Sequence, residues 1–187
     1  MAVMLRRYRF TVEEYERLAQ AQVLTQCDRV ELLDGEIVEM SPIGDRHASV
    51  VARLTRLFSS QLGERGLVWV QNPVRLRVVR SVPQPDVVLA RPRADFYATG
   101  KPGPDDVLLL IEVMDTSAET DRHVKLPLYA RAGIGEVWLL DLTTDRVDIF
   151  RQPTADGYRQ ATTLERRDRL TPEAFPDFSL TVADLLG

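Results

Sequence analysis

Two carboxylates stand at the ends of two apolar segments of the sequence. Asp86 opens the segment "DVVLA", and Glu112 comes near the end of "VLLLIEV". If these segments are neighbouring antiparallel strands, the carboxylates converge at one edge of the sheet. Two such charges about 4 Å apart repel by about 4 kcal/mol at an effective dielectric constant of ~20, so one is protonated or a cation lies between them. Mg²⁺ suits such a pair, because it binds through one or two carboxylates with water and substrate phosphate.

A lysine follows these carboxylates in the sequence. Lys125 is one of only two lysines, and it lies on or just before the next predicted helix. Packed on the sheet, this helix would bring the ammonium group to the same edge, to orient a water or offset charge on a phosphate. Each residue also has a structural alternative. Lys125 would be a solvated helix residue, Asp86 a turn residue after proline, and Glu112 the partner of an arginine.

Composition excludes several classes of protein. The 187 residues suffice for one domain with a sizeable core, and 44% hydrophobic with 28% charged residues is typical of soluble globular proteins. A single cysteine, Cys27, excludes a disulfide framework and a thiolate metal cluster, and indicates a reducing cytoplasm. We expect no signal peptide and no membrane span. The net charge of −4 argues against coating nucleic acid through basicity alone.

The elements near the N-terminus can be predicted from local patterns. Thr11 followed by Glu14 forms a capping-box pattern and predicts a helix in "TVEEYERLAQ". The dipeptide Asp34-Gly35 favours a type I′ turn, so "RVELLDGEIVEM" predicts a hairpin. Apolar residues at positions 50, 51, 54, 57, 58 and 62 have helical spacing, and a following glycine would end this helix.

Strands and helices alternate in the rest of the chain. Strands are predicted for "LVWVQ", "VRLRVV", "DVVLA" and "VLLLIEV", followed by a helix over about 121–131. That helix becomes regular only near Leu126, because Pro127 suits a first turn. A second hairpin is expected around Thr144-Asp145, with a further strand over 158–164. Buried strands with helices between them indicate an α/β layer structure around a mixed sheet.

These segments resemble a known family. "QPDVVLA", "LLLIEVMDTSAETDRHVKLPLYARAGIGEVWLLD" and the earlier "VELLDGEIVEMSPIGDRHASVVARL" are similar to the Uma2 family, within the PD-(D/E)XK nuclease superfamily. The resemblance runs from about Phe10 to the C-terminal "FSLTVADLL". It implies a single domain over 1–187 of the α/β class. Its restriction-endonuclease-like core would span about 43–141, with an N-terminal helix and hairpin and extra C-terminal strands.

The resemblance also implies which residues form the PD-(D/E)XK motif. Pro85-Asp86 would supply the PD and Glu112 the acidic residue. Met114 stands where the simple motif has lysine, and Lys125, on the following helix, would take over that role.

Further residues would complete the site that the resemblance implies. The carbonyl of Val113 would join the two carboxylates in holding Mg²⁺, or Mn²⁺. Glu31 would be a metal or water contact, and His47 a proton carrier or phosphate contact, although each is equally a surface residue by pattern. Arg75 and Arg77 share one face of a predicted strand and would contact phosphate, or face solvent.

The implied function is a cytoplasmic, Mg²⁺-dependent endonuclease that hydrolyses phosphodiester bonds, in DNA rather than RNA. A homodimer is expected, because two-fold symmetry suits cutting both strands of a duplex. Asp115 adds a carboxylate that would tighten or disturb metal binding. Two alternatives stay open. One is a catalytically silent binding module that kept the nuclease fold, which the pI of 5.3 favours. The other is an enzyme that uses the carboxylate pair on a sugar, for which the sequence has no aromatic-rich cleft.

Overall fold

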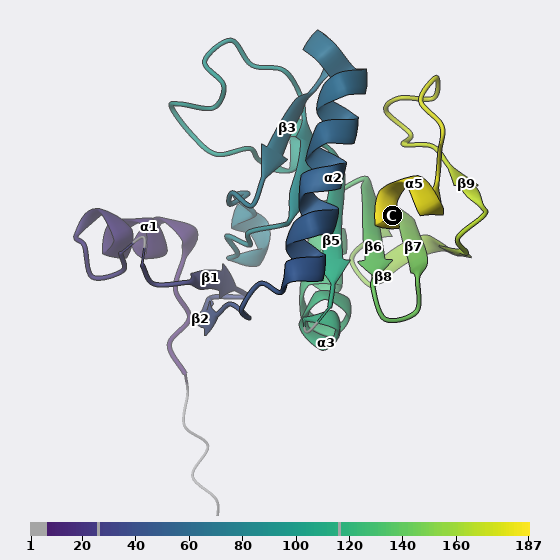
Figure 1. The fold of residues 1–187 in the computed structure, drawn as a ribbon. Helices are drawn as coiled ribbons and strands as arrows, with labels where there is room; N and C mark the ends of the chain where they lie inside the picture. Colours follow the sequence, from purple (N-terminus) through teal and green to yellow (C-terminus); the bar gives the residue numbers. More distant parts are fainter. Residues whose placement is uncertain (1–6, 26, 116) are drawn as a thin grey trace, which may run out of the picture.

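A six-stranded mixed sheet forms the centre of the computed structural model, which describes residues 7–25, 27–115 and 117–187 (Figure 1). Its order is β3 (Leu67–Val70), β4 (Val87–Ala90), β5 (Val107–Met114), β6 (Glu136–Asp141), β7 (Arg146–Thr154) and β8 (Gly157–Leu164). Strands β5 and β6 are parallel, and the other neighbouring pairs are antiparallel. The mixed central sheet is therefore confirmed, and it extends past residue 141 into β7 and β8.

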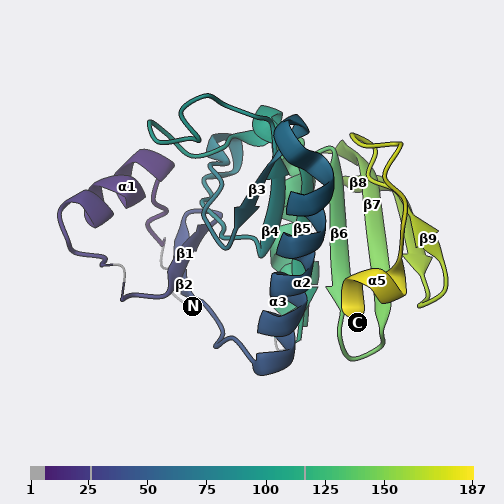
Figure 2. The ribbon, with the colours of Figure 1, turned by 45° about the horizontal axis from the view of Figure 1, so that its top comes forward.

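Helices cover both faces of this sheet. The long helix α2 (Asp45–Leu62) and the C-terminal α5 (Val182–Leu186) share one hydrophobic core with the sheet, and α4 (Leu126–Ala132) shares the other. Figure 2 shows α2 in front of the sheet, running roughly along its strands. Side chains of a strand alternate between the faces, so Ile111 and Val113 point towards α2, while Leu110 and Met114 point towards α4. Glu112 therefore belongs to the α4 side.

The N-terminal residues form a small unit beside the sheet. Helix α1 (Val12–Gln20) starts with the predicted capping box, in which the Thr11 N–H donates to Glu14 Oε2 at 2.8 Å. Strands β1 (Val30–Leu33) and β2 (Glu36–Glu39) form the predicted hairpin. Asp34 and Gly35 have φ of 47° and 80°, as a type I′ turn requires. The unit joins the larger body through its own apolar cluster, which consists of Val12, Leu32 and Val82.

Removing the cap of α1 should have a modest, local cost. In Thr11→Ala the Glu14 N–H loses its acceptor, and we expect the free energy of unfolding to fall by about 1 kcal/mol. Urea denaturation followed by circular dichroism measures this change. Thr11→Ser keeps the hydroxyl and serves as the control. Equal stability of the alanine and serine variants would show that the cap contributes nothing.

The strand predicted for "VRLRVV" is wrong. Residues 77–79 form a short 3-10 turn instead, and Arg80 has a left-handed φ of 47°, so the chain turns back on itself. The alternation of apolar and arginine residues has another cause in this loop. Val74, Leu76 and Val79 are buried, although Val78 is exposed. Arg75 pairs with Glu16 at 2.6 Å and Arg77 with Glu13 at 2.7 Å, both on α1.

The segment after β5 is helical, as expected, with an irregular start. Helix α3 (Ala118–Thr120) leads into a π-helical turn over Asp121–Lys125, and α4 follows from Leu126. The hairpin of β6 and β7 and the strand β8 are also confirmed. Two short strands, β9 (Arg169–Leu170) and β10 (Leu180–Thr181), precede α5. Within the described ranges, no helix combines the length and apolar character needed to cross a bilayer.

Candidate active site

The register of β4 and β5 places Asp86 beside Glu112, as expected for antiparallel neighbours. Val87 faces Ile111, so the residues one step further along, Asp86 and Glu112, are opposite each other. The Val113 N–H donates to Asp86 Oδ2 at 2.8 Å, and the Asp86 N–H lies 3.3 Å from Glu112 Oε2. Both carboxylates therefore lie at the same edge of the sheet.

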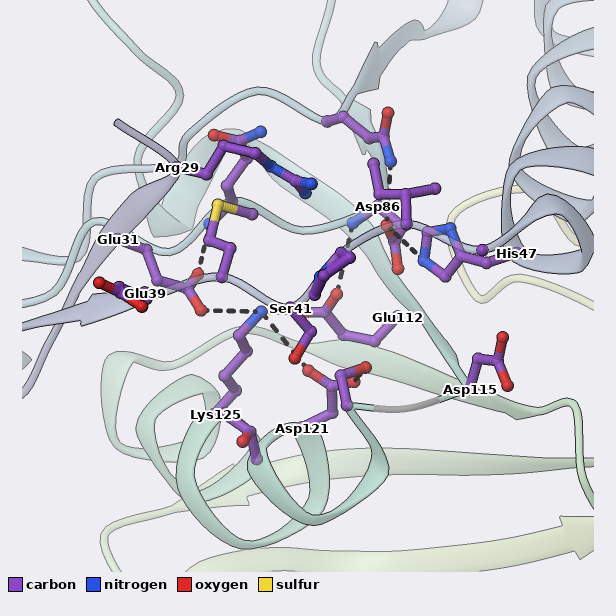
Figure 3. A pocket seen from close by; sticks show the side chains of 18 residues that line it. Arg29, Glu31, Glu39, Ser41, His47, Asp86, Glu112, Asp115, Asp121 and Lys125 are labelled. Carbon is purple, nitrogen blue, oxygen red and sulfur yellow. Dashed lines mark hydrogen bonds and ion pairs between the residues drawn. The ribbon is translucent and has the colours of Figure 1, made fainter. Parts of the chain in front are cut away.

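A small polar pocket opens at this edge (Figure 3). Its volume is about 90 Å³, which is room for a few waters or an ion with its waters rather than for a sugar ring. The titratable residues at its centre are Glu31, His47, Asp86, Glu112, Asp121 and Lys125. Five of these six were predicted site residues. Together they come from the β1–β2 hairpin, α2, the start of β4, the end of β5 and the π-helical turn.

The ammonium group of Lys125 lies within a cluster of three carboxylates, which we call the carboxylate cluster: Glu31, Glu112 and Asp121. Lys125 Nζ is 3.2 Å from Glu31 Oε1, 3.4 Å from Glu112 Oε1 and 3.4 Å from Asp121 Oδ1. The lysine side chain is only 7% exposed, and each carboxylate side chain 5% or less. This lysine is therefore a buried ion-pair partner rather than a solvated helix residue.

The helical spacing of three residues explains how they reach Glu112. Asp121, Lys125 and Tyr129 follow one another at intervals of four, which puts them on one helical face. That face lies against the sheet side to which Glu112 points. The Tyr129 hydroxyl donates to Glu112 Oε1 at 2.5 Å, so it contacts the same oxygen as the ammonium group. The Oε2 oxygen of Glu112 faces Asp86.

The buried charges shift the pKa values of these groups. Burial raises the pKa of Glu112 well above its ordinary value, and the charges of Asp121 and Asp86 raise it further, while Lys125 opposes them. Burial likewise raises the pKa of Asp121. For Lys125, burial acts to lower the pKa, but the three carboxylates together raise it above the ordinary value. The lysine therefore stays protonated. Among the residues that line the pocket, acidic side chains outnumber basic ones.

His47 binds Asp86 from the first turn of α2. Its Nε2 lies 3.0 Å from Asp86 Oδ1, and this hydrogen bond raises the pKa of the imidazole despite its partial burial. Among the described residues, His47 Nδ1 is buried without a hydrogen-bond partner. His47 thus fixes the orientation of Asp86 through Nε2, while its Nδ1 makes no hydrogen bond with the described residues.

The remaining predicted residues lie at or outside the pocket. Asp115 lines it, on the side of Gly44. Met114 is fully buried among apolar residues on the α4 side. Arg75 and Arg77 do not line this pocket, because they form ion pairs with α1. Their role in substrate binding stays a prediction.

Sequence patterns did not identify two of the residues that hold the site together. Asp121 lies outside the PD-(D/E)XK motif, and the apolar helical position of Tyr129 predicts only a buried ring, which has zero exposure. The signal that could have identified them is the four-residue spacing of Asp121 and Tyr129 on either side of Lys125. Glu112 is paired with Lys125 and Tyr129 rather than with one of the many arginines.

Replacing Tyr129 by phenylalanine isolates the effect of its hydroxyl group. We expect the affinity of the site for Mn²⁺ to fall by about 10–100-fold, as for other partners that orient a metal ligand, because Glu112 Oε1 loses its donor. Calorimetric titration with Mn²⁺ measures the change. Tyr158→Phe, which removes a hydroxyl that bonds to Ile134 O far from the pocket, is the control. Equal affinity in both variants would contradict the role of Tyr129.

The donor set fits a hard divalent ion, which prefers oxygen ligands. A strand residue projects its N–H and C=O to the same side, so the Val113 carbonyl points towards Asp86, as its N–H does. Asp86, Glu112 and this carbonyl can together supply three oxygens. In the ranges that the structure covers, no three His, Cys, Asp or Glu side chains form a complete metal-ligand set, so waters would have to complete the shell. The excess of carboxylates over cations favours a divalent ion here.

Comparisons with known proteins identify a family and a solved structure with a similar fold. The family model Uma2, described as "Putative restriction endonuclease", matches residues 12–183. The crystal structure of a protein from Anabaena variabilis ATCC 29413, described as a putative nuclease belonging to DUF820, is similar with a TM-score of 0.71. The similarity covers 95% of this chain and 97% of that chain at 15% sequence identity, so it shows the fold. The predicted fold class is thus confirmed. No curated protein matches the chain.

Proposed function

The chain belongs to the Uma2 family, and from this premise we propose that it is a metal-dependent endonuclease whose active site is the pocket at the start of β4 and the end of β5. Family membership supports a nuclease, that is, a hydrolase acting on phosphodiester bonds. The single observation that carries the proposal is the convergence of Asp86, Glu112 and Lys125 in one buried pocket.

Asp86, Glu112 and the Val113 carbonyl would hold the ion, which we propose to be Mg²⁺, with Mn²⁺ as a substitute. A bound divalent ion supplies Lewis acidity that polarises the phosphate and lowers the pKa of a nearby water. The residues of the chain do the positioning. His47 fixes Asp86 from one side, and the Val113 N–H fixes it from the other. Lys125 and the Tyr129 hydroxyl contact Glu112 in the same way, so both ligands are held in place before any ion or substrate arrives.

The cationic side chains would act on the phosphate. Lys125 remains protonated because of the carboxylates around it, so its contribution is positive charge rather than proton transfer. Arg29 lines the same pocket from the hairpin side, and Figure 3 shows it between Glu31 and Asp86. Its planar guanidinium suits two oxygens of one phosphate. A phosphodiester entering the pocket would therefore meet the Arg29 guanidinium as well as the carboxylates, while Lys125 would act on it through its charge.

We propose DNA as the substrate, a homodimer as the working form and the cytoplasm as the location, since the resemblance and the single cysteine support these assignments. An enzyme acting on sugars is less consistent with the site. Among the residues that line the pocket in the described ranges there is no Phe, Tyr or Trp on which a sugar ring could stack.

Cleavage assays on three substrates test the proposal. Closed circular duplex DNA, single-stranded DNA and RNA of one sequence are incubated with the protein in Mg²⁺, in Mn²⁺ and in EDTA. We expect cleavage of DNA with either ion, loss of cleavage in EDTA, and its return when Mg²⁺ is added in excess. Absence of cleavage on all three substrates, combined with binding of DNA in fluorescence anisotropy, would identify a catalytically silent binding module instead.

A further inference from the structure

The ammonium group of Lys125 is enclosed by three carboxylates. An ammonium group has three N–H donors. Three carboxylates lie around it, and the nearest oxygens of Glu31, Glu112 and Asp121 are 3.2, 3.4 and 3.4 Å away. With 7% of the lysine side chain exposed, these carboxylates are the main partners of the ammonium group. In this arrangement Lys125 acts as a cation bound in a carboxylate site.

The two oxygens of Glu112 face different partners. Oε2 faces the backbone of Asp86, where the proposed ion would lie. Oε1 faces Lys125 and the Tyr129 hydroxyl. In two-metal hydrolytic sites the ions are about 3.5–4 Å apart, a separation that one carboxylate can bridge with its two oxygens. A second ion bridged by Glu112 would therefore have to lie on the Oε1 side, where the ammonium group already is.

We propose that Lys125 permanently takes the place of a second divalent ion, so that the site binds one divalent ion per chain. Asp121 and Glu31 are then positioning residues, which act through Lys125 and not as ligands of the catalytic ion. This inference rests on the proposed function, because it specifies the metal content of that same site. The carboxylate cluster would act as a cation site in its own right once the lysine is removed.

The number of Mn²⁺ ions bound per chain tests the inference without any measurement of activity. Equilibrium dialysis of the metal-free wild-type protein against Mn²⁺, with Asp86→Asn as the measure of adventitious surface binding, should give one specific ion per chain. Two specific ions per wild-type chain would overturn the inference while leaving a metal-dependent nuclease in place. No specific ion would contradict the proposed function itself, and the inference with it.

Removal of the lysine provides the second part of the test. In Lys125→Met the carboxylate cluster loses its ammonium group, and we expect the bound Mn²⁺ to rise from one ion per chain to two. The matched control is Asp121→Asn combined with Lys125→Met, which removes one carboxylate as well and should return the value towards one. One ion in folded Lys125→Met would overturn the inference. If this variant folds poorly, the wild-type stoichiometry still decides between one ion and two.

Discussion

Asp86→Asn is expected to lower the rate of DNA cleavage by about 10³-fold. The substitution keeps the shape of the side chain and an acceptor for the Val113 N–H, but it removes the negative charge that would hold the ion. Metal-ion stabilisation of the transition state is worth several kcal/mol, and about 4 kcal/mol corresponds to about 10³-fold in rate. Single-turnover cleavage of an end-labelled duplex in Mg²⁺ measures the effect.

The loss of activity in Asp86→Asn should not come from unfolding. Neutralising one carboxylate in a pocket with several uncompensated charges relieves repulsion, so the thermal midpoint should stay the same or rise. Asp141→Asn is the matched control, because Asp141 also ends a strand of the sheet but its carboxylate bonds only to the turn that follows. The Asp141→Asn protein should cleave DNA at the wild-type rate. Comparable rates for Asp86→Asn and wild type would remove Asp86 from the active site.

Lys125→Met is expected to destabilise the metal-free protein by about 3–5 kcal/mol, which is the cost of breaking a buried ion pair from one side. Methionine has the same unbranched shape as the aliphatic part of lysine, so the loss comes mainly from the removed ammonium group. Glu31, Glu112 and Asp121 would then share a buried site without a cation. Millimolar Mn²⁺ should restore much of this stability, because it can replace the ammonium group. Urea denaturation with and without Mn²⁺ measures both effects.

A second buried ion pair in the protein provides the control for this prediction. Glu136 is nearly fully buried, and it accepts hydrogen bonds from Arg151 at 2.6 Å and from Trp138 at 2.9 Å, outside the pocket. Arg151→Met should also be destabilised, but Mn²⁺ should rescue it less, because Arg151 pairs with one buried carboxylate, Glu136, and one exposed carboxylate, Glu173, rather than with three buried ones. Equal rescue of Arg151→Met and Lys125→Met by Mn²⁺ would contradict the specific role of the carboxylate cluster.

Sequence patterns could predict the elements and part of the site. Asp86 and Glu112 could be identified because strand ends are local features, and antiparallel pairing follows from a small set of topologies. Lys125 could be placed only through the resemblance, since Met114 occupies the usual position of the lysine. The burial of the lysine depends on Glu31, which is distant in sequence and reaches it only when the hairpin packs beside the sheet.

Two features depended on contacts that no local pattern contains. The alternation around Arg75 and Arg77 is typical of a strand, but acidic residues of α1, about 60 positions earlier in the chain, hold both arginines in a loop. The second feature is the hydroxyl contact of Tyr129. The apolar helical position of this residue correctly predicts a buried ring, but it does not predict the hydrogen bond from the hydroxyl to Glu112. Long-range pairing overrides a local preference in the first case. In the second case it adds a contact that the local pattern does not contain.

The central claim is that the pocket at the start of β4 and the end of β5 is a metal site with Asp86 and Glu112 as ligands. The position of a bound ion tests it most directly. Crystals of the wild-type protein soaked in Mn²⁺ can be measured at a wavelength where manganese scatters anomalously. We predict one strong peak per chain, within coordination distance of both carboxylates and the Val113 carbonyl. A peak elsewhere in the molecule, or an empty pocket at saturating Mn²⁺, would contradict the claim.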